Sequence, residues 1–508
     1  MTASGSSLRP DQLRPVSLAS LFAGAPDVPI SGVSLDSRAI RPGDLYVALP
    51  GTATHGAKFA TQALTAGAVA ILTDPSGAGL LPASAVAVVV DDPRALMAGA
   101  AAAIYQHPGT ELALLGVTGT TGKTSTTFLL AAGLAAAGHR VGTIGTLGFR
   151  LDGQTLISSR TTVTTPESPD LQGLLAYLLQ HGADSVAMEV SSHALALGRT
   201  DELIFDVAGF TNLGRDHLDF HRDQEDYFQA KARLFRDGHS RAAVINIDDD
   251  FGRRLAAEVR AAGLRSVTTG AGAEADYFVL DAQPVAAGGS RVQLRTPRGV
   301  REFTLGLLGD FNQRNATTAA AMLEVAGVDL DQALPGLASA AIPGRMQVVD
   351  LGPQAPHAVV DFAHTPESVA AALAALPSGR TVAVLGCGGD RDQAKRGPMG
   401  AAAARGAQVV VVTDDNPRSE DPEAIRAAVL AGAREEAERT GAQVVDGGQR
   451  GDAIAVALRL AGPEDWVAVL GKGHETGQQL ADRTIPFDDV TALIEQWGRL
   501  AGHQEDEA

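Results

Sequence analysis

A glycine-rich loop between a predicted strand and a predicted helix constrains the fold of this chain more than any other feature of its sequence. The apolar run 112–117 is followed by TGTTGKTS (118–125) and then by a stretch rich in alanine and leucine. Glycines let backbone N–H groups approach phosphates, and the N-terminus of a helix adds positive potential. We therefore predict an α/β domain that binds ATP or GTP, with Lys123 at the β- and γ-phosphates and the Thr124 hydroxyl at Mg²⁺. The predicted nucleotide-binding residues of the loop are Gly119, Thr120, Thr121, Gly122, Lys123, Thr124 and Ser125.

Composition and charge exclude several classes of protein. The 508 residues are 45% hydrophobic and 20% charged, and 59 acidic against 41 basic residues give a net charge of −18. This balance argues against general binding to nucleic acid or to anionic membranes, which need a basic face. No apolar run approaches the roughly 20 residues that span a bilayer, the N-terminus lacks a signal-peptide pattern, and Cys387 is the single cysteine. We expect a cytoplasmic protein with no nucleic-acid and no membrane partner.

Short β-branched runs alternate with alanine-rich helical stretches along the whole chain. Continuous apolar runs are typical of buried parallel strands whose faces are covered by helices, so the predicted class is α/β. Turn-forming residues at 107–110 and 342–345 precede two of these runs and indicate domain junctions. We predict the domains 1–109, 110–341 and 342–508. The predicted strands are 85–90, 112–117, 184–190, 242–247, 358–362, 381–386, 408–413 and 465–471.

Polar clusters follow the loop within the predicted second domain. Glu189 ends an apolar run, His217 lies in a polar segment after another such run, and Lys231 lies near the middle of the amphipathic stretch 227–235. Because ligands of open α/β sheets bind at the carboxyl ends of the strands, Glu189 is placed to hold the Mg²⁺ of a nucleotide. Taken singly, each residue has a plain alternative: a solvated strand end, a loop histidine and an exposed helical lysine.

These clusters and several later motifs resemble those of the Mur ligases. The matching segments run in order from about Leu35 to Glu475, nearly the whole chain. The resemblance implies a three-domain architecture: an N-terminal UDP-binding domain, a central P-loop ATPase domain and a C-terminal Rossmann-like domain. The segments are GVTGTTGKTS (116–125), MEVSSHALALGR (188–199), TNLGRDHLDFH (211–221), YFQAKARLF (227–235), LGDFNQRNATTAA (308–320), PGRM (343–346), DFAHTPES (361–368) and GKGHE (471–475).

The resemblance also implies roles for individual residues. It makes Lys123, Glu189, His217 and Lys231 the catalytic set, and it gives Thr124, Glu189, His217 and Lys231 as Mg²⁺ ligands. Lys231 would be present as a CO₂-derived carbamate (N6-carboxylysine), an anionic oxygen ligand where a bare ammonium would repel the cation. Further nucleotide contacts are implied at Asn315, Arg345 and Asp361. Contacts with the UDP-linked substrate are implied at Leu35, Ser37, Thr164, Thr165, Ser191 and Arg199.

The predicted third domain bears on the choice of amino acid. In the ligases that this chain resembles, DNPR (415–418) is the pattern associated with meso-diaminopimelate, whose second carboxylate faces the arginine. Glu475 would read the distal ammonium of that amino acid. A pocket with a buried guanidinium rejects a substrate that lacks its partner. The implied pocket residues are Arg391, Asp415, Asn416, Pro417, Arg418, Gly471 and Glu475.

The implied reaction joins UDP-N-acetylmuramoyl-L-alanyl-D-glutamate to meso-diaminopimelate with consumption of ATP, in the synthesis of the bacterial cell wall. The γ-phosphate would pass to the D-glutamate carboxylate, and the incoming amine would attack the acyl phosphate. Lys123, Mg²⁺ and basic side chains would stabilise the accumulating negative charge. Because Lys123 and Arg345 lie in different predicted domains, we expect domain closure around ATP. We also expect a monomer.

Alternatives exist within and beyond this family. The same ligase could add L-lysine or L-ornithine, a folylpolyglutamate synthase shares the ATPase core, and a nucleotide-binding scaffold could keep the fold without turnover. Departures from the usual motifs are Val117 for glycine, Ser125 for threonine, Gly214 for serine and Phe362 for tyrosine. None of them removes a proposed charge or metal ligand.

Overall fold

The computed structural model describes residues 8–506 apart from 12, 159–163, 215, 218–219 and 286–287. Arg215, Leu218 and Asp219 of the motif TNLGRDHLDFH therefore lie outside the described residues. Contacts divide the chain into two compact units, which are described separately. The first comprises Met1–Asp281, Gln293–Phe303 and Arg314–Ser339, and the second comprises Ala282–Val292, Thr304–Gln313 and Ala340–Ala508.

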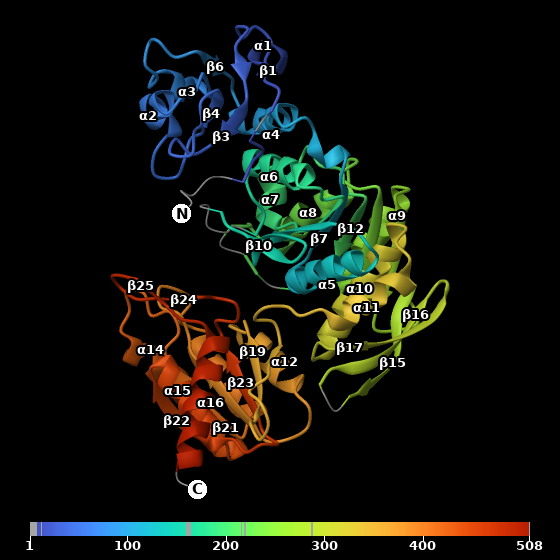
Figure 1. Ribbon diagram of the computed structural model, residues 1–508, viewed down its shortest axis with the longest axis vertical. Coiled ribbons are helices and arrows are strands. Elements are labelled where there is room, and N and C mark those ends of the chain that lie inside the picture. Colours follow the sequence, from blue (N-terminus) through green and yellow to red (C-terminus); the bar gives the residue numbers. More distant parts are fainter. Residues whose placement is uncertain are drawn as a thin grey trace. The chain divides into compact units, whose positions relative to one another are not determined.

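The N-terminal part of the first unit contains a small parallel sheet in the order β3-β4-β5-β6 (blue in Figure 1). Leu45 and Leu72 contribute to the core on one face, whereas Tyr46 and Ile71 contribute to the core on the other, as the alternation of side chains along a strand requires. The elements are β1 (Val16–Ser17), α1 (Leu18–Leu21), β2 (Pro29–Ile30), β3 (Gly32–Ser34), β4 (Asp44–Ala48), η1 (Gly56–Phe59), α2 (Ala60–Thr65), β5 (Ala70–Thr73), α3 (Pro75–Ala78), β6 (Ala87–Val89) and α4 (Pro93–Ile104).

The larger sheet has the order β10-β9-β8-β11-β7-β12-β13-β14-β15-β16-β17. Strands β8, β11, β7, β12, β13 and β14 pair in parallel, so their carboxyl ends meet at one edge. Its strands are β7 (Ala113–Thr118), β8 (Val141–Gly145), β9 (Gly148–Leu151), β10 (Gln154–Leu156), β11 (Ser185–Glu189), β12 (Val207–Phe210), β13 (Ala242–Asn246), β14 (Arg265–Gly270), β15 (Tyr277–Pro284), β16 (Ser290–Thr296) and β17 (Gly299–Leu305).

Strand β7 lies between β11 and β12, and Gly116 is in register with Met188 on one side and Ala208 on the other. The glycine-rich loop therefore leaves the sheet next to the ends of β11 and β12. Helix α5 follows the loop and packs on β7, β8 and β11 with its buried face. The helices and turns of this region are η2 (Pro108–Thr110), α5 (Lys123–Ala136), α6 (Ser168–Gln180), α7 (Ser192–Ala196), α8 (Gln224–Ala232), η3 (Arg233–Phe235), α9 (Asp250–Ala261), α10 (Asp310–Val325) and α11 (Leu330–Ser339).

The second unit is built on a sheet in the order β18-β19-β23-β20-β21-β22 (orange to red in Figure 1). All neighbours pair in parallel except β18 with β19. Helices α12, α13 and α14 supply the core on one face, and α15 and α16 supply it on the other. The elements are β18 (Gln347–Val349), β19 (His357–Asp361), α12 (Pro366–Ala374), β20 (Thr381–Leu385), α13 (Arg396–Gly406), β21 (Val409–Thr413), α14 (Pro422–Thr440), β22 (Gln443–Gly448), α15 (Arg450–Leu460), β23 (Trp466–Leu470), β24 (Gly477–Gln479), β25 (Thr484–Pro486) and α16 (Asp489–Asp506).

The predicted α/β class is confirmed, and each predicted strand is present, although 85–90 is a strand only over Ala87–Val89. The amphipathic stretch 227–235 is only partly α-helical. Helix α8 ends at Ala232 and continues as a 3₁₀ turn, so Lys231 lies in the last turn of α8 and not near its middle. Within the described ranges, no helix is both long and apolar enough to cross a bilayer.

Candidate active site

The glycine-rich loop turns from β7 into α5 with glycine in the left-handed region of the backbone at two positions. The angle φ is +149° at Gly119 and +84° at Gly122, values that favour glycine. Space favours glycine as well, because a Cβ at Gly119 would displace the Thr211 hydroxyl and one at Gly122 would displace the side-chain oxygen of Asn315. The Lys123 ammonium donates to two carbonyl groups of the loop, at 2.9 Å each. The lysine is therefore folded over the loop.

The segment after β12 holds the loop in place. The Asn212 side-chain oxygen accepts a hydrogen bond from the N–H of Thr121 at 3.0 Å, and the Asn212 carbonyl accepts one from the N–H of Thr120 at 2.9 Å. Thr124 and Ser125 are buried in the first turn of α5. The predicted nucleotide-binding residues of this loop thus form one connected turn at the carboxyl edge of the sheet.

Lys231 reaches the same loop from α8. Its side chain is buried, its Nζ donates to the Gly119 carbonyl at 2.8 Å, and the same atom lies 4.5 Å from the centre of the Tyr227 ring. Burial, together with the nearby charge of Lys123, lowers the pKa of Lys231 well below its ordinary value. The alternative of an exposed helical lysine is therefore wrong, and the structure favours a neutral amine at this position.

Glu189 ends β11 and is only 1% exposed, so the alternative of a solvated strand end is also wrong. Its carboxylate accepts hydrogen bonds from the backbone N–H of Thr146 at 2.8 Å and from the Thr146 hydroxyl at 3.0 Å. The Thr146 hydroxyl also lies 3.2 Å from that of Thr164. Thr146 therefore fixes the direction of the Glu189 carboxylate and joins it to one of the residues predicted to contact the UDP-linked substrate.

Thr165, Ser191 and Arg199 meet beside the end of β11. The Thr165 hydroxyl donates to the Glu189 carbonyl at 2.9 Å and accepts from the N–H of Ser191 at 3.0 Å. Arg199 donates to the Thr165 carbonyl at 2.9 Å and pairs with the Glu167 carboxylate at 2.9 Å. These contacts fix the direction of the Arg199 guanidinium, whose charge is paired with Glu167.

His217 lies in the loop after β12 with φ +53°, and 42% of its side chain is exposed. The centre of its ring lies 6.0 Å from that of Tyr227, the ring that Lys231 also contacts. Nowhere in the described part of the chain do three or more His, Cys, Asp and Glu side chains form a group that could hold a metal ion. A cation at this loop would need further oxygen ligands of other kinds, such as hydroxyl, phosphate or water oxygens.

Leu35 and Ser37 lie in the turn after β3, in the N-terminal sheet. The Ser37 hydroxyl is buried and donates to the side-chain oxygen of Gln62 at 3.0 Å. Asp36, between them, accepts from the N–H of Arg38 at 2.9 Å. Side-chain hydrogen bonds therefore fix this turn.

In the second unit, Arg345 and Asp361 lie close together. The Asp361 carboxylate accepts hydrogen bonds from the N–H groups of Met346 at 2.7 Å and Ala363 at 2.8 Å. Burial raises the pKa of Asp361 above its ordinary value, although these two donors and Arg345 act in the opposite direction. The Arg345 guanidinium lies 4.4 Å from the centre of the Phe362 ring, a cation–π distance.

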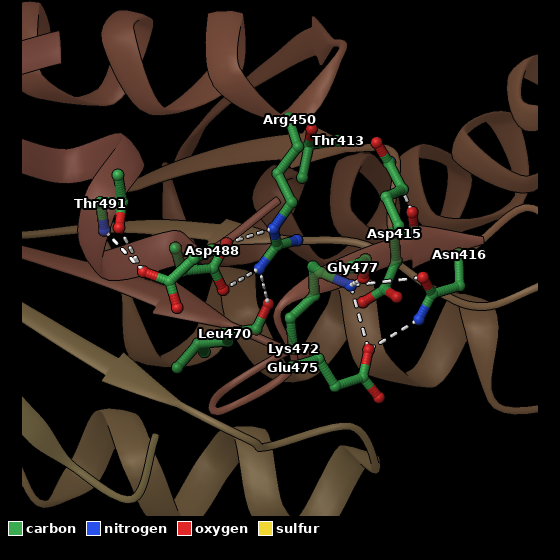
Figure 2. A network of polar contacts seen from close by, with 12 residues as sticks. Thr413, Asp415, Asn416, Arg450, Leu470, Lys472, Glu475, Gly477, Asp488 and Thr491 are labelled. Atoms are coloured by element: carbon green, nitrogen blue, oxygen red, sulfur yellow. Dashed lines mark hydrogen bonds and ion pairs between the residues drawn. The ribbon is translucent and has the colours of Figure 1, made fainter. Parts of the chain in front are cut away.

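The loops after β21 and β23 form a network of polar contacts (Figure 2). The buried Lys472 ammonium donates to the side-chain oxygen of Asn416 at 3.2 Å, to the Glu475 carboxylate at 3.0 Å and to the Gly477 carbonyl at 2.6 Å. The Asn416 amide nitrogen donates to the same Glu475 oxygen at 2.8 Å. Burial acts to raise the pKa of Glu475, but the Lys472 charge and the hydrogen bonds outweigh it and hold that pKa below its ordinary value.

The other predicted pocket residues surround this network. Arg418, with φ +51°, donates through Nη1 to the Gly389 carbonyl at 2.7 Å. A Cβ at Gly471 would lie 2.8 Å from the Asp415 carboxylate, and one at Gly389 would collide with the Pro417 carbonyl. Arg391 is exposed and donates only to the carbonyl of its neighbour at 3.3 Å among the described residues. Apart from Arg391, the predicted pocket residues are therefore packed together.

Several residues of the site were missed from the sequence. Lys472 and Tyr227 stand inside segments that carry the family resemblance, GKGHE and YFQAKARLF, but no sequence rule gave them a role. Thr146 and Gln479 had no local signal at all, because their partners, Glu189 and Arg418, lie far from them in the sequence.

Comparison with known proteins agrees with this geometry. Three descriptions of Mur ligase domains match the chain: "Mur ligase family, catalytic domain" at residues 29–106, "Mur ligase middle domain" at 117–323 and "Mur ligase, glutamate ligase domain" at 344–473. The chain is 48% identical to the UDP-N-acetylmuramoyl-L-alanyl-D-glutamate--2,6-diaminopimelate ligase of Streptomyces coelicolor over 95% of this chain and 96% of that protein.

Two further similarities agree with the first. The protein of the same name from Corynebacterium glutamicum is 46% identical over 91% of this chain and 90% of its own length. A solved structure of a ligase of that name is 31% identical with a TM-score of 0.70, over 96% of this chain and 99% of the other. Relatives with this identity over nearly the full length leave one conclusion: the chain belongs to the Mur ligase family.

Proposed function

We propose that this chain is an ATP-dependent ligase that adds meso-2,6-diaminopimelate to the D-glutamate of UDP-N-acetylmuramoyl-L-alanyl-D-glutamate, in the synthesis of peptidoglycan precursors. The observation that carries the proposal is the convergence of Lys123 and Lys231 on the Gly119 carbonyl, at 2.9 and 2.8 Å. A phosphate loop alone suits many reactions. A second, buried lysine at the same loop, together with relatives named for this ligation, supports amide-bond formation.

The nucleotide would bind on the loop 119–125, where backbone N–H groups and the start of α5 receive the phosphates. Lys123 would exchange its two loop carbonyls for the β- and γ-phosphates. Asn315, beside Gly122, and Arg345 and Asp361 of the second unit are the proposed further contacts of ATP. The Phe362 ring holds the Arg345 guanidinium, which supports a role for this cation in binding an anion.

The residues fit Mg²⁺ and a carbamate on Lys231. Glu189 offers a carboxylate held by two donors, His217 offers a ring nitrogen and Thr124 a hydroxyl. Mg²⁺ commonly keeps several waters and takes one or two carboxylates together with phosphate oxygens. The lowered pKa of Lys231 supports the neutral amine that adds CO₂ with loss of one proton. When bound, Mg²⁺ would neutralise charge on the reacting phosphates.

The UDP-linked peptide would lie between the N-terminal sheet and the end of β11. Leu35 and Ser37 are the proposed contacts of the uridine end, and Thr164, Thr165, Ser191 and Arg199 those of the peptide end. The γ-phosphate would pass to the D-glutamate carboxylate, giving ADP and an acyl phosphate. The incoming amine would then attack the acyl carbon, and phosphate would leave with formation of the amide. Lys123 would stabilise the negative charge on the transferred group.

The amino-acid pocket would lie in the second unit. Arg418 would bind the second carboxylate of meso-diaminopimelate, and Glu475 would bind its distal ammonium, so that a cation and an anion each find a partner. Arg391, Asp415, Asn416, Pro417 and Gly471 would complete the pocket. L-Lysine and L-ornithine lack the second carboxylate and would make no bond to Nη2 of Arg418, at a cost to binding.

The test is phosphate release from ATP with UDP-N-acetylmuramoyl-L-alanyl-D-glutamate and one amino acid at a time. We expect turnover with meso-diaminopimelate, and about 10- to 100-fold lower kcat/KM with L-lysine or L-ornithine, because a hydrogen bond to a charged group contributes roughly 1.5–3 kcal/mol. Arg418→Ala should lose most of the activity with meso-diaminopimelate. Turnover with lysine or ornithine instead would support the ligase activity but would contradict meso-diaminopimelate as the amino acid that is added. Absence of turnover with all three would favour the scaffold.

We further propose a cytoplasmic monomer with the three domains 1–109, 110–341 and 342–508. The single cysteine, Cys387, is buried and cannot form an internal disulfide, which supports a reducing compartment. The expected domain closure around ATP stays a prediction.

A further inference from the structure

The hairpin β24–β25 directly follows the GKGHE segment and has no assigned role. Its strands pair antiparallel, with Gln479 opposite Thr484. Each residue of β24 bonds to a loop of the proposed amino-acid pocket: Gly477 accepts from Lys472 at 2.6 Å, and the buried Gln478 side chain donates to the Asp415 carbonyl at 2.6 Å. Hydrogen bonds from a neighbouring element hold the side chains of a binding site in a defined geometry.

Gln479 makes the most contacts with the DNPR loop. Its N–H donates to the side-chain oxygen of Asn416 at 2.9 Å. Its carbonyl accepts from the N–H of Arg418 at 3.1 Å, and its side-chain oxygen accepts from Nε of Arg418 at 2.8 Å. One residue of the hairpin therefore fixes both the amide of Asn416 and the guanidinium of Arg418.

The contacts of Arg418 leave part of its guanidinium open to a ligand. Nε is bonded to Gln479 and Nη1 to the Gly389 carbonyl, whereas Nη2 has no partner among the described residues. A Cβ at Gly388 would lie 2.9 Å from Nη1, so the turn at 388–389 confines the same side chain. A long side chain has many rotamers in solution, and a bound carboxylate must select one of them. Bonds that select that rotamer in advance reduce the cost of binding.

The same hairpin also acts on the opposite charge of the pocket. The Gly477 carbonyl and Asn416 both bond to Lys472, which donates to one oxygen of Glu475. The other oxygen of Glu475 turns away from the network in Figure 2 and has no hydrogen bond among the described residues. The hairpin thus contacts the surroundings of both Arg418 and Glu475. Among the described residues, each of these two side chains keeps one hydrogen-bonding atom without a partner.

We propose that the hairpin β24–β25 sets the amino-acid specificity of this ligase, with Gln479 as the positioning residue that orients Arg418 toward the second carboxylate of a diamino diacid. This inference rests on the proposed function. Gln479 acts through Arg418 and touches no substrate atom. Its loss should therefore weaken binding of the amino acid without affecting binding of ATP.

The experiment measures phosphate release for the full chain carrying Gln479→Ala, Arg418→Ala, both substitutions, or Thr484→Ala. Thr484 is the exposed cross-strand neighbour of Gln479 and serves as the matched control. We expect Gln479→Ala to raise the KM for meso-diaminopimelate about tenfold with unchanged kcat and unchanged KM for ATP, the range of one hydrogen bond to a charged group. Thr484→Ala should behave as wild type. Gln479→Met, which keeps the volume without the acceptor, should repeat the effect of Gln479→Ala.

The double variant separates positioning from general damage. If Gln479 acts through Arg418, adding Gln479→Ala to Arg418→Ala should leave kcat/KM for meso-diaminopimelate unchanged. The inference is overturned by an unchanged KM in Gln479→Ala and Gln479→Met, by an equal rise in the KM for ATP, or by multiplication of the two effects in the double variant. Absence of turnover by wild type would instead overturn the proposed function. Turnover by wild type with unaffected variants would overturn this inference alone.

Discussion

The pairing of Lys472 with Glu475 decides the protonation of the proposed pocket. Lys472 is fully buried, and its ammonium is bonded to Glu475, Asn416 and Gly477. Glu475 is itself partly buried, which by itself would favour the neutral acid. The charge of Lys472 keeps it a carboxylate, so that it can bind an ammonium.

Lys472→Met should make binding of the amino acid dependent on pH. In wild type the pKa of Glu475 lies below its ordinary value. The ionised carboxylate therefore stabilises the folded protein at pH values above the ordinary pKa, and this stabilisation is lost only as the pH falls through the lowered pKa of the folded state. Without Lys472, burial remains as the largest cause and raises this pKa. We expect the KM for meso-diaminopimelate to rise as the pH is lowered, and this rise should begin at a higher pH in the variant than in wild type. A profile identical to that of wild type would contradict this account, and the KM for ATP serves as the control.

At the scale of elements, the phosphate loop and α5 were predictable from the sequence because their geometry is local. Glycines at fixed spacing, a lysine and a helix start all lie within one short segment. The surroundings of Lys231 and the hairpin β24–β25 were not predictable in this way. The burial of Lys231 depends on its contact with Gly119, 112 residues away. The role of Gln479 depends on the Arg418 contact, 61 residues away.

The family resemblance supplied what local patterns could not, but only for residues inside its motifs. It gave Lys231 and Arg418 their roles and added to the strand-end argument for Glu189. Thr146 and Gln479, which orient Glu189 and Arg418, stand outside every quoted segment. Such supporting residues are set by the three-dimensional register of strands and loops. A single sequence without a structure does not reveal that register.

Gly122→Ala should weaken ATP binding by more than the added backbone strain alone would. A residue with a Cβ at φ +84° costs about 1–2 kcal/mol, and the new Cβ would also displace the side chain of Asn315. Gly138, just after α5, has φ +92°, and a Cβ added there would meet nothing within 4 Å, so Gly138→Ala is the matched control for strain. We expect the KM for ATP to rise at least about tenfold in Gly122→Ala and to stay unchanged in Gly138→Ala, although both melt at lower temperature. Equal KM values in the two variants would contradict a role of this loop in nucleotide binding.

At the scale of the whole molecule, the second unit has its own sheet and its own cores on both faces. One buried ion pair ties three of its elements together. Arg450, at the start of α15, donates to both oxygens of Asp489, at the start of α16, at 2.6 and 2.7 Å. It also donates to the Leu470 carbonyl at 3.1 Å (Figure 2). Both side chains are fully buried. We therefore expect the two units to unfold in separate thermal transitions.

Arg450→Met should lower the stability of the second unit without an equal effect on the first. Removal of the guanidinium leaves the Asp489 carboxyl buried without its partner, which costs about 3–5 kcal/mol, and a unit of this size should then melt roughly 10 °C lower. In differential scanning calorimetry we expect one of two transitions to shift, while Arg459→Met, an exposed position on the same helix, leaves both in place. A shift of both transitions by the same amount would show that the units unfold as one. In that case the buried pair would stabilise the whole chain, and the two units would unfold in one cooperative transition despite their separate cores.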